Sequence, residues 1–162
     1  AVKQAERMKF STREDIEAPI EHVWASVTRF QRFERQLLRR GAEVVRSDAA
    51  GQPGPGTEWT VTFEYRGKPR TVEAKVTEFD RPHAMRLSSH SGGVEGLVSI
   101  DLVALSPRRT RLQVGVELTA TNLSARLLLQ SLKFAKSNLN KRFTDRIYEF
   151  AQDVESDYVN AV

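Results

Sequence analysis

The chain contains no cysteine, so disulfide bonds, thiolate metal ligands and cysteine nucleophiles are excluded. No apolar stretch approaches the roughly 20 residues that a membrane-spanning helix needs, and residues 96–105 are interrupted by Ser99 and Asp101. The first residues, AVKQAER, are charged and lack the apolar segment of a signal peptide. We therefore expect a soluble cytoplasmic protein without a transmembrane segment.

The sequence also lacks internal repeats, low-complexity tracts and linkers between domains. A length of 162 residues is typical of one domain, and folding at this size buries roughly 70% of the surface of the unfolded chain. We expect a single domain over residues 9–160, preceded by an N-terminal extension over residues 1–8.

The charge is mildly basic, with a formal net charge of +4 and a pI near 9.6. Basic residues cluster between Arg29 and Arg40 and again between Lys133 and Arg146. Neither cluster alternates with aromatic residues as nucleic-acid motifs do, and acidic residues are scattered through most other segments. The charge pattern therefore predicts an ordinary solvated surface and no nucleic-acid partner.

Proline and glycine are absent from Ser124 to Tyr158, and apolar side chains recur there in steps of three and four residues. This period predicts one long helix with an apolar stripe, about 50 Å in length at about 1.5 Å per residue. The stripe consists of Leu128, Leu132, Ala135, Leu139, Phe143, Ile147, Phe150 and Val154. Such a helix needs an equally long apolar partner.

Strands supply that partner, because apolar and polar side chains alternate through much of the preceding chain. A strand over residues 9–17 is followed by two short helices, from Ile20 to Val27 and from Phe30 to about Gly41. Six further strands are predicted over residues 42–46, 58–66, 72–77, 83–89, 96–105 and 110–119. The segment from Gly51 to Gly56 holds too much glycine and proline for a regular element and is predicted to be a loop.

The segment from Ile16 to Trp24, IEAPIEHVW, carries a resemblance to a known family. With residues 56–59, residues 108–112 and the order of elements over residues 9–158, it resembles the START-like or SRPBCC superfamily. That superfamily includes polyketide cyclase/dehydrase-like, lipid-transfer and pathogenesis-related proteins. The resemblance implies an α+β helix-grip fold, in which a seven-stranded antiparallel sheet curves around the C-terminal helix and leaves a cavity between them.

Residues on the inner faces of these strands and of the helix are the candidates for contact with a ligand, although each is also suited to plain packing. Trp59 and Tyr65 add a polar group that could orient a ligand. The candidates are Trp59, Val61, Phe63, Tyr65, Met85, Leu87, Val98, Ile100, Val114, Leu132, Ala135, Leu139, Arg142, Phe143 and Arg146, together with Val72, Ala74, Leu102, Leu112 and Val116.

Arg142 and Arg146 are unusual candidates, because both fall on or beside the apolar stripe of the long helix. A buried guanidinium without a partner is costly. Each arginine therefore extends to solvent, pairs with a carboxylate such as Asp101 or Glu117, or binds an anionic ligand.

Charge along the helix is distributed against its dipole, with basic residues in the first half and acidic residues in the second. The basic half contains Arg126, Lys133, Lys136 and Lys141. Either this order has no consequence, or the basic half binds an acidic partner or lipid head groups. Contact with a membrane surface is thus left open.

No catalytic, metal-binding or nucleotide-binding motif is present among the residues, and we expect no cofactor and no metal. Three hypotheses follow. The first is binding or transport of a small hydrophobic, and in some cases anionic, molecule. The second is a polyketide cyclase or aromatase-like enzyme, in which His90, Tyr65 or Arg142 would converge in the cavity. The third is a module that binds a quinone or a protein, using a surface patch from Arg29 to Arg40 that includes Phe30 and Phe33.

Overall fold

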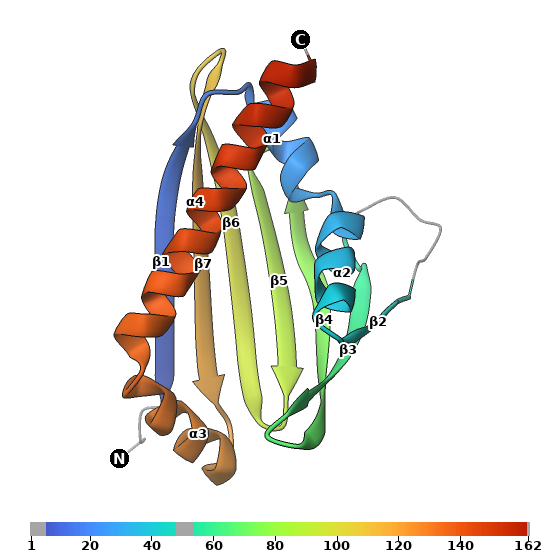
Figure 1. Ribbon diagram of the computed structural model, residues 1–162, viewed down its shortest axis with the longest axis vertical. Coiled ribbons are helices and arrows are strands. Elements are labelled where there is room, and N and C mark those ends of the chain that lie inside the picture. Colours follow the sequence, from blue (N-terminus) through green and yellow to red (C-terminus); the bar gives the residue numbers. More distant parts are fainter. Residues whose placement is uncertain (1–5, 48–53, 162) are drawn as a thin grey trace.

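One antiparallel sheet organises the computed structural model, which describes residues 6–47 and 54–161. The described residues form seven strands and four helices (Figure 1). In chain order they are β1 (Arg7–Ile16), α1 (Ile20–Val27), α2 (Phe30–Arg39), β2 (Glu43–Arg46), β3 (Glu58–Tyr65), β4 (Lys68–Asp80), β5 (Ala84–Ser91), β6 (Val94–Ser106), β7 (Arg109–Ala120), α3 (Leu123–Lys133) and α4 (Lys136–Ala161).

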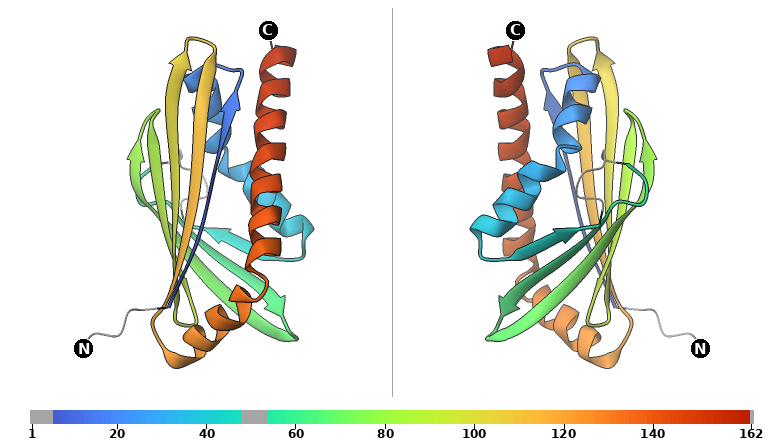
Figure 2. Two further views of the ribbon diagram at one scale, coloured as in Figure 1. Left: turned by 90° about the vertical axis from the view of Figure 1, so that its left-hand side faces the viewer. Right: turned by 90° about the vertical axis from the view of Figure 1, so that its right-hand side faces the viewer.

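The strands lie in the order β1-β7-β6-β5-β4-β3-β2, and every neighbouring pair is antiparallel. The sheet curves, and α4 crosses its concave side (Figure 2). The helices α1 and α2 lie on the same side of the sheet as α4 (Figures 1 and 2). This arrangement is the predicted helix-grip fold, and the predicted succession of one strand, two short helices and six strands along the chain is confirmed.

Alternation along the strands explains why one side of the sheet is apolar. Cross-strand pairs such as Trp59 with Ala74 and Leu87 with Val98 belong to the side that faces the helices. Leu102 and Leu112 extend the same core, and Val154 of α4 is fully buried against it. Burial of this face holds the sheet and the helices together.

The C-terminal region differs from the single helix predicted over 124–158. The chain forms two helices, and the break lies at Phe134 and Ala135 although neither glycine nor proline is present. Phe134 N–H and Ala135 N–H bond to carbonyls three residues earlier, so the last turn of α3 is tightened. The reason is tertiary: Ala125 and Leu129 of α3 pack in a separate cluster with Ala120, whereas α4 packs on the main core.

The first helix is fixed to α4 through His22. Its Nε2 atom lies 3.1 Å from the carbonyl oxygen of Val154, and its ring centroid lies 5.1 Å from that of Tyr158. The His22 side chain is half-buried in this contact. The contact joins the C-terminal end of α4 to the segment that follows β1.

One strand boundary also differs from expectation. The strand β1 begins at Arg7, two residues before its predicted start, and Met8 is buried. Residues 51–53 of the predicted loop lie outside the described residues. Gly56, within them, has a φ of 85° and bonds through its N–H to the Val76 carbonyl, which explains a glycine at this turn.

The packing of the sheet gives a first prediction. Leu102 is 2% exposed in the core, whereas Val103, the next residue of β6, is 54% exposed on the opposite face. Leu102→Ala is expected to lower the free energy of unfolding by about 2–5 kcal/mol, since it removes buried methyl groups and leaves a cavity. Val103→Ala is the matched control and should cost less than about 1 kcal/mol in urea unfolding. Equal losses for the two variants would contradict the assigned faces.

A second prediction concerns acid stability. Arg111 on β7 donates to Asp15 on β1 through Nε at 2.9 Å and through Nη2 at 3.3 Å. The hydrogen bond and charge of Arg111 hold the pKa of Asp15 below its usual value. This pair therefore stabilises the fold above the unfolded-state pKa, and its contribution is lost as the pH falls through the folded-state pKa.

Asp15→Asn should consequently reduce stability at neutral pH, and the difference from the native chain should shrink as the pH falls below about 4. Denaturant unfolding across this pH range measures the effect. Glu14→Gln is the control, since Glu14 neighbours Asp15 and has no ion pair within residues 6–47 and 54–161. A difference that stays constant with pH would show that Asp15 acts through packing alone.

Candidate functional site

A cavity of about 540 Å³ lies between the concave side of the sheet and the helices α2 and α4. Its floor is apolar, and five strands contribute to it. The floor residues are Trp59, Val61, Ala74, Met85, Leu87, Val98, Ile100, Leu112 and Val114. Helical residues complete the apolar wall, namely Val27, Phe30, Phe33, Leu37, Ile147 and Phe150.

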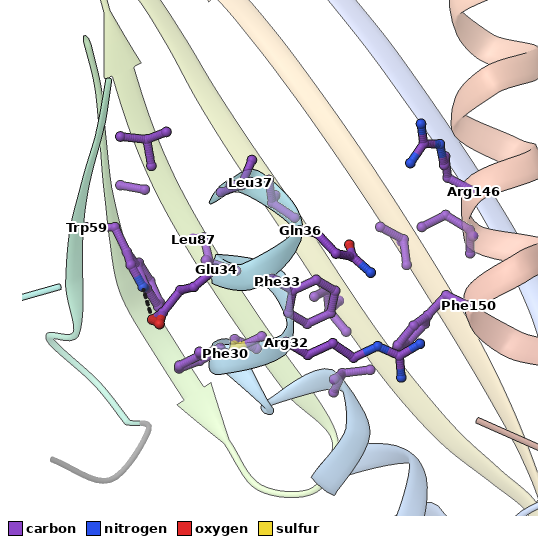
Figure 3. Close-up of a pocket in the computed structure, with 18 of the residues that line it drawn as sticks. Phe30, Arg32, Phe33, Glu34, Gln36, Leu37, Trp59, Leu87, Arg146 and Phe150 are labelled. Carbon is purple, nitrogen blue, oxygen red and sulfur yellow. Dashed lines mark hydrogen bonds between the residues drawn. The ribbon is translucent and has the colours of Figure 1, made fainter. Parts of the chain in front are cut away.

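Polar side chains of the cavity all come from the two helices and from the residue that follows α2 (Figure 3). They are Arg32, Glu34 and Gln36 of α2, Arg40 directly after it, and Arg146, Glu149 and Asp153 of α4. Gln36 and Arg146 extend towards the gap between the two helices (Figure 3). The arrangement gives an apolar interior with hydrogen-bonding and charged groups along one side.

One carboxylate of this set is tied to the sheet. Trp59 Nε1 donates to Glu34 Oε1 at 3.0 Å, and Arg46 Nε lies 3.5 Å from the same oxygen. The Glu34 side chain is only 20% exposed. The Trp59 ring also meets the Phe30 ring edge to face at 4.8 Å between centroids. These contacts fix the distance between α2 and β3.

On the other side, α2 is fixed to α4. Arg32 Nη2 donates to Asp153 Oδ2 at 2.8 Å, and Arg32 Nη1 lies 3.7 Å from Asp157 Oδ2. The Arg32 guanidinium lies 5.7 Å from the Phe150 ring centroid, and the Phe33 and Phe150 centroids are 5.8 Å apart. Contacts at both edges of α2 therefore keep it away from the middle of the sheet, and the cavity lies beneath it.

The structure brings eight of the candidate residues together in the cavity lining: Trp59, Val61, Met85, Leu87, Val98, Ile100, Val114 and Arg146. Ala74 and Leu112 join them. Whether these residues contact a ligand stays a prediction.

The remaining candidates lie outside the lining: Phe63, Tyr65, Leu132, Ala135, Leu139, Arg142 and Phe143, and also Val72, Leu102 and Val116. Tyr65 is 39% exposed beside Arg66 at the end of β3. Leu132 packs with the α3 cluster, and Phe143 packs against Phe10 of β1. The break in the helix explains only Leu132 and Ala135, since Leu132 lies in α3 and Ala135 lies at the break. Leu139, Arg142 and Phe143 belong to α4 but precede the part of it that lines the cavity.

Arg142 and Arg146 differ in their position relative to the cavity. Arg146 is exposed yet contributes to the cavity lining, and it forms no ion pair within the part of the chain that the structure describes. Arg142 is exposed and lies outside the lining.

The predicted internal partners of these arginines are wrong. Asp101 Oδ1 accepts from Arg86 Nη2 at 2.8 Å, and Glu117 pairs with Arg7 and Lys9. Solvent and an anionic ligand therefore remain the alternatives for Arg146.

The contribution of α2 to the cavity was not predicted from the sequence. Phe30, Phe33, Glu34 and Leu37 follow the helical period and share one face, which is a signal for a second covering helix. In the predicted surface patch, Phe30 is only 5% exposed and lines the cavity, so it is absent from the surface. Phe33 also lines the cavity but stays 37% exposed.

The proposed convergence of His90, Tyr65 and Arg142 is also wrong, because none of them lines the cavity. His90 Nε2 lies 3.0 Å from Glu73 Oε2, and both side chains are mostly exposed. Among the residues that the structure describes, no group of three or more histidine, aspartate or glutamate side chains could hold a metal ion. Within the same residues, no helix is long and apolar enough to cross a membrane.

Residues 7–155 match the model of the family described as polyketide cyclase / dehydrase and lipid transport, and the chain belongs to this family. The match covers β1 through most of α4, so it includes all the elements that form the cavity. No curated protein sequence matches the chain significantly.

Solved structures share the fold at low identity. Truncated norcoclaurine synthase from Thalictrum flavum has a TM-score of 0.64 and 16% identity, with 98% of each chain covered. The Zhui aromatase/cyclase from Streptomyces sp. R1128 has a TM-score of 0.65 and 12% identity, with 92% of this chain and 94% of the other covered. A protein of unknown function from Staphylococcus aureus has a TM-score of 0.67 and 11% identity over 97% and 98% of the two chains.

Proposed function

We propose that the protein binds or carries a small hydrophobic molecule in the cavity beneath α2 and α4. The observation that carries the proposal is an apolar cavity of about 540 Å³ whose polar groups lie on the helical side only. Ligand sites in proteins typically have volumes of about 300–1,000 Å³, mostly apolar walls and a few polar groups that orient the ligand. A lipid or an aromatic molecule suits this chemistry, and a cytoplasmic location stays a prediction from the sequence.

Arg146 supports a preference for ligands with a negative end. Its side chain lies at the cavity, and it has no ion pair among the described residues that would compete for the guanidinium. Arg40, which directly follows the facing helix α2, also contributes to the lining. A carboxylate or sulfonate at the gap between the helices would receive charge-assisted hydrogen bonds while its apolar body fills the interior.

A cyclase or aromatase-like enzyme is the second candidate, and the observation that favours it is Glu34. Its carboxylate is mostly buried at the cavity and already accepts a hydrogen bond from Trp59. An acid–base group must lie within hydrogen-bonding reach of the reacting proton. Among the carboxylates of the lining, Glu34 is the one that directly contacts the floor residue Trp59. The family description names cyclases, dehydrases and lipid transport together, and it therefore supports both candidates.

The binding proposal is tested with two fluorescent probes of similar shape, the anion anilinonaphthalene sulfonate and the neutral phenylnaphthylamine. We expect both to bind the native chain with enhanced fluorescence. Val98→Trp places a large ring in the cavity and should lower the affinity for both probes by roughly tenfold or more. Leu97→Trp is the matched control, since Leu97 is the preceding residue and is 41% exposed on the opposite face.

Arg146→Ala should lower the affinity for the anionic probe by roughly threefold to tenfold and leave the neutral probe unaffected. Arg142→Ala, which removes an exposed arginine outside the cavity, should change neither affinity. Unchanged binding to the Val98→Trp chain would refute the cavity as the binding site. Equal effects of the two arginine variants would refute only the preference for an anion.

A further inference from the structure

The helix α3 lies at one end of the molecule (Figure 1). Large apolar side chains are exposed on its outer face and at Phe134, the residue that follows it. Leu123 is 70% exposed, Leu127 is 57% exposed and Phe134 is 95% exposed. At about 100° per residue, these three positions fall within about 40° of one another around the helix axis. They form a continuous stripe, which we name the α3 stripe.

The fold does not require this stripe. The opposite face of α3 carries the residues that attach the helix to the sheet, Ala125 at 2% and Leu129 at 0% exposure. Asn122 caps the helix, since its Oδ1 accepts from the Ala125 N–H at 2.8 Å. The helix is therefore anchored on its inner face, and the outer apolar residues contact solvent instead of the core.

Basic residues accompany the stripe in the sequence, without acidic residues among them. Residues 121–144 contain five basic residues and no aspartate or glutamate, so their formal charge is +5. The basic residues are Arg126, Lys133, Lys136, Lys141 and Arg142. Of these, Lys133 pairs with Glu6, and the other four form no ion pair in the described ranges 6–47 and 54–161. The segment that carries these apolar side chains is therefore positively charged.

We propose that the α3 stripe and its basic residues dock on an anionic lipid bilayer, with Leu127 and Phe134 inserted at the interface. Interfacial helices combine apolar anchors with lysine and arginine in this way. Shape favours a bilayer, because α3 projects at the end of the molecule as a convex feature (Figure 2). A bilayer accepts a protruding aromatic ring, whereas a partner helix needs a groove. The proposal rests on the surface of α3 and does not depend on a ligand in the cavity.

Co-sedimentation of the full chain with vesicles tests the proposal. We expect binding to vesicles of phosphatidylcholine and phosphatidylserine, little binding to phosphatidylcholine alone, and weaker binding as salt is raised. The double variant Leu127→Ser, Phe134→Ser should lower the vesicle affinity by roughly tenfold or more, since it removes the inserted side chains. The double variant Lys136→Gln, Lys141→Gln should lower it by a similar factor for the anionic vesicles, at roughly fivefold per charge for residues close to the membrane.

Two controls separate this surface from general stickiness and from the cavity. Val45→Ser with Val103→Ser removes apolar side chains of 65% and 54% exposure elsewhere on the molecule and should keep the vesicle affinity. Val98→Trp, which blocks the cavity, should keep it as well, so loss of the carrier function and loss of docking are distinguishable. Absence of binding to anionic vesicles, or equal binding by the Leu127 and Phe134 variant, would overturn the proposal. Dimerisation of the native chain through the stripe would also overturn it. Light scattering would then give the mass of a dimer for the native chain and half that mass for Phe134→Ser.

Discussion

The width of the sheet is the constraint on which the rest of the structure depends. Seven strands about 4.8 Å apart span roughly 29 Å, whereas a helix with its side chains is about 10–12 Å across. One helix therefore leaves part of the apolar concave side exposed. The helices α1 and α2 cover the remainder. The helix α1 contacts α4 through His22, whereas α2 lies at a distance from the middle of the sheet. The Trp59–Glu34 bond and the Arg32–Asp153 pair hold α2 above the sheet, and the cavity is the volume that this distance leaves.

The same contacts determine the chemistry of the site. Strands present only apolar side chains to the cavity because polar residues alternate to the outer face, where Arg86 pairs with Asp101. Polar groups can then enter only from helices, and those of α2 and α4 face each other across one gap (Figure 3). A molecule with an apolar body and one charged end fits this separation. Glu34 is held by Trp59 and Arg46, so its structural role is evident from the geometry, whereas a role in proton transfer needs a substrate.

Much of the fold could be predicted because strands such as Glu58–Tyr65 alternate strictly and because one motif marks the first strand and helix. The break at Phe134 could not be predicted, because the apolar period continues through it. One helix ends and another begins there only because Leu129 and Val154 pack in separate clusters. The cavity residues of the strands were predictable from alternation. Those of α2 were not recognised, because Arg32 and Glu34 resemble a solvated charged face until their partners on α4 and β3 are known.

The open volume beneath α2 is the central claim, and a crystal structure of the chain pressurised with xenon tests it directly. Apolar cavities that are empty of protein atoms bind xenon. The account predicts xenon density in contact with Leu87, Val98 and Ile100, with the Trp59–Glu34 hydrogen bond intact. Side chains of α2 packed directly onto these three residues, with no xenon between them, would contradict it.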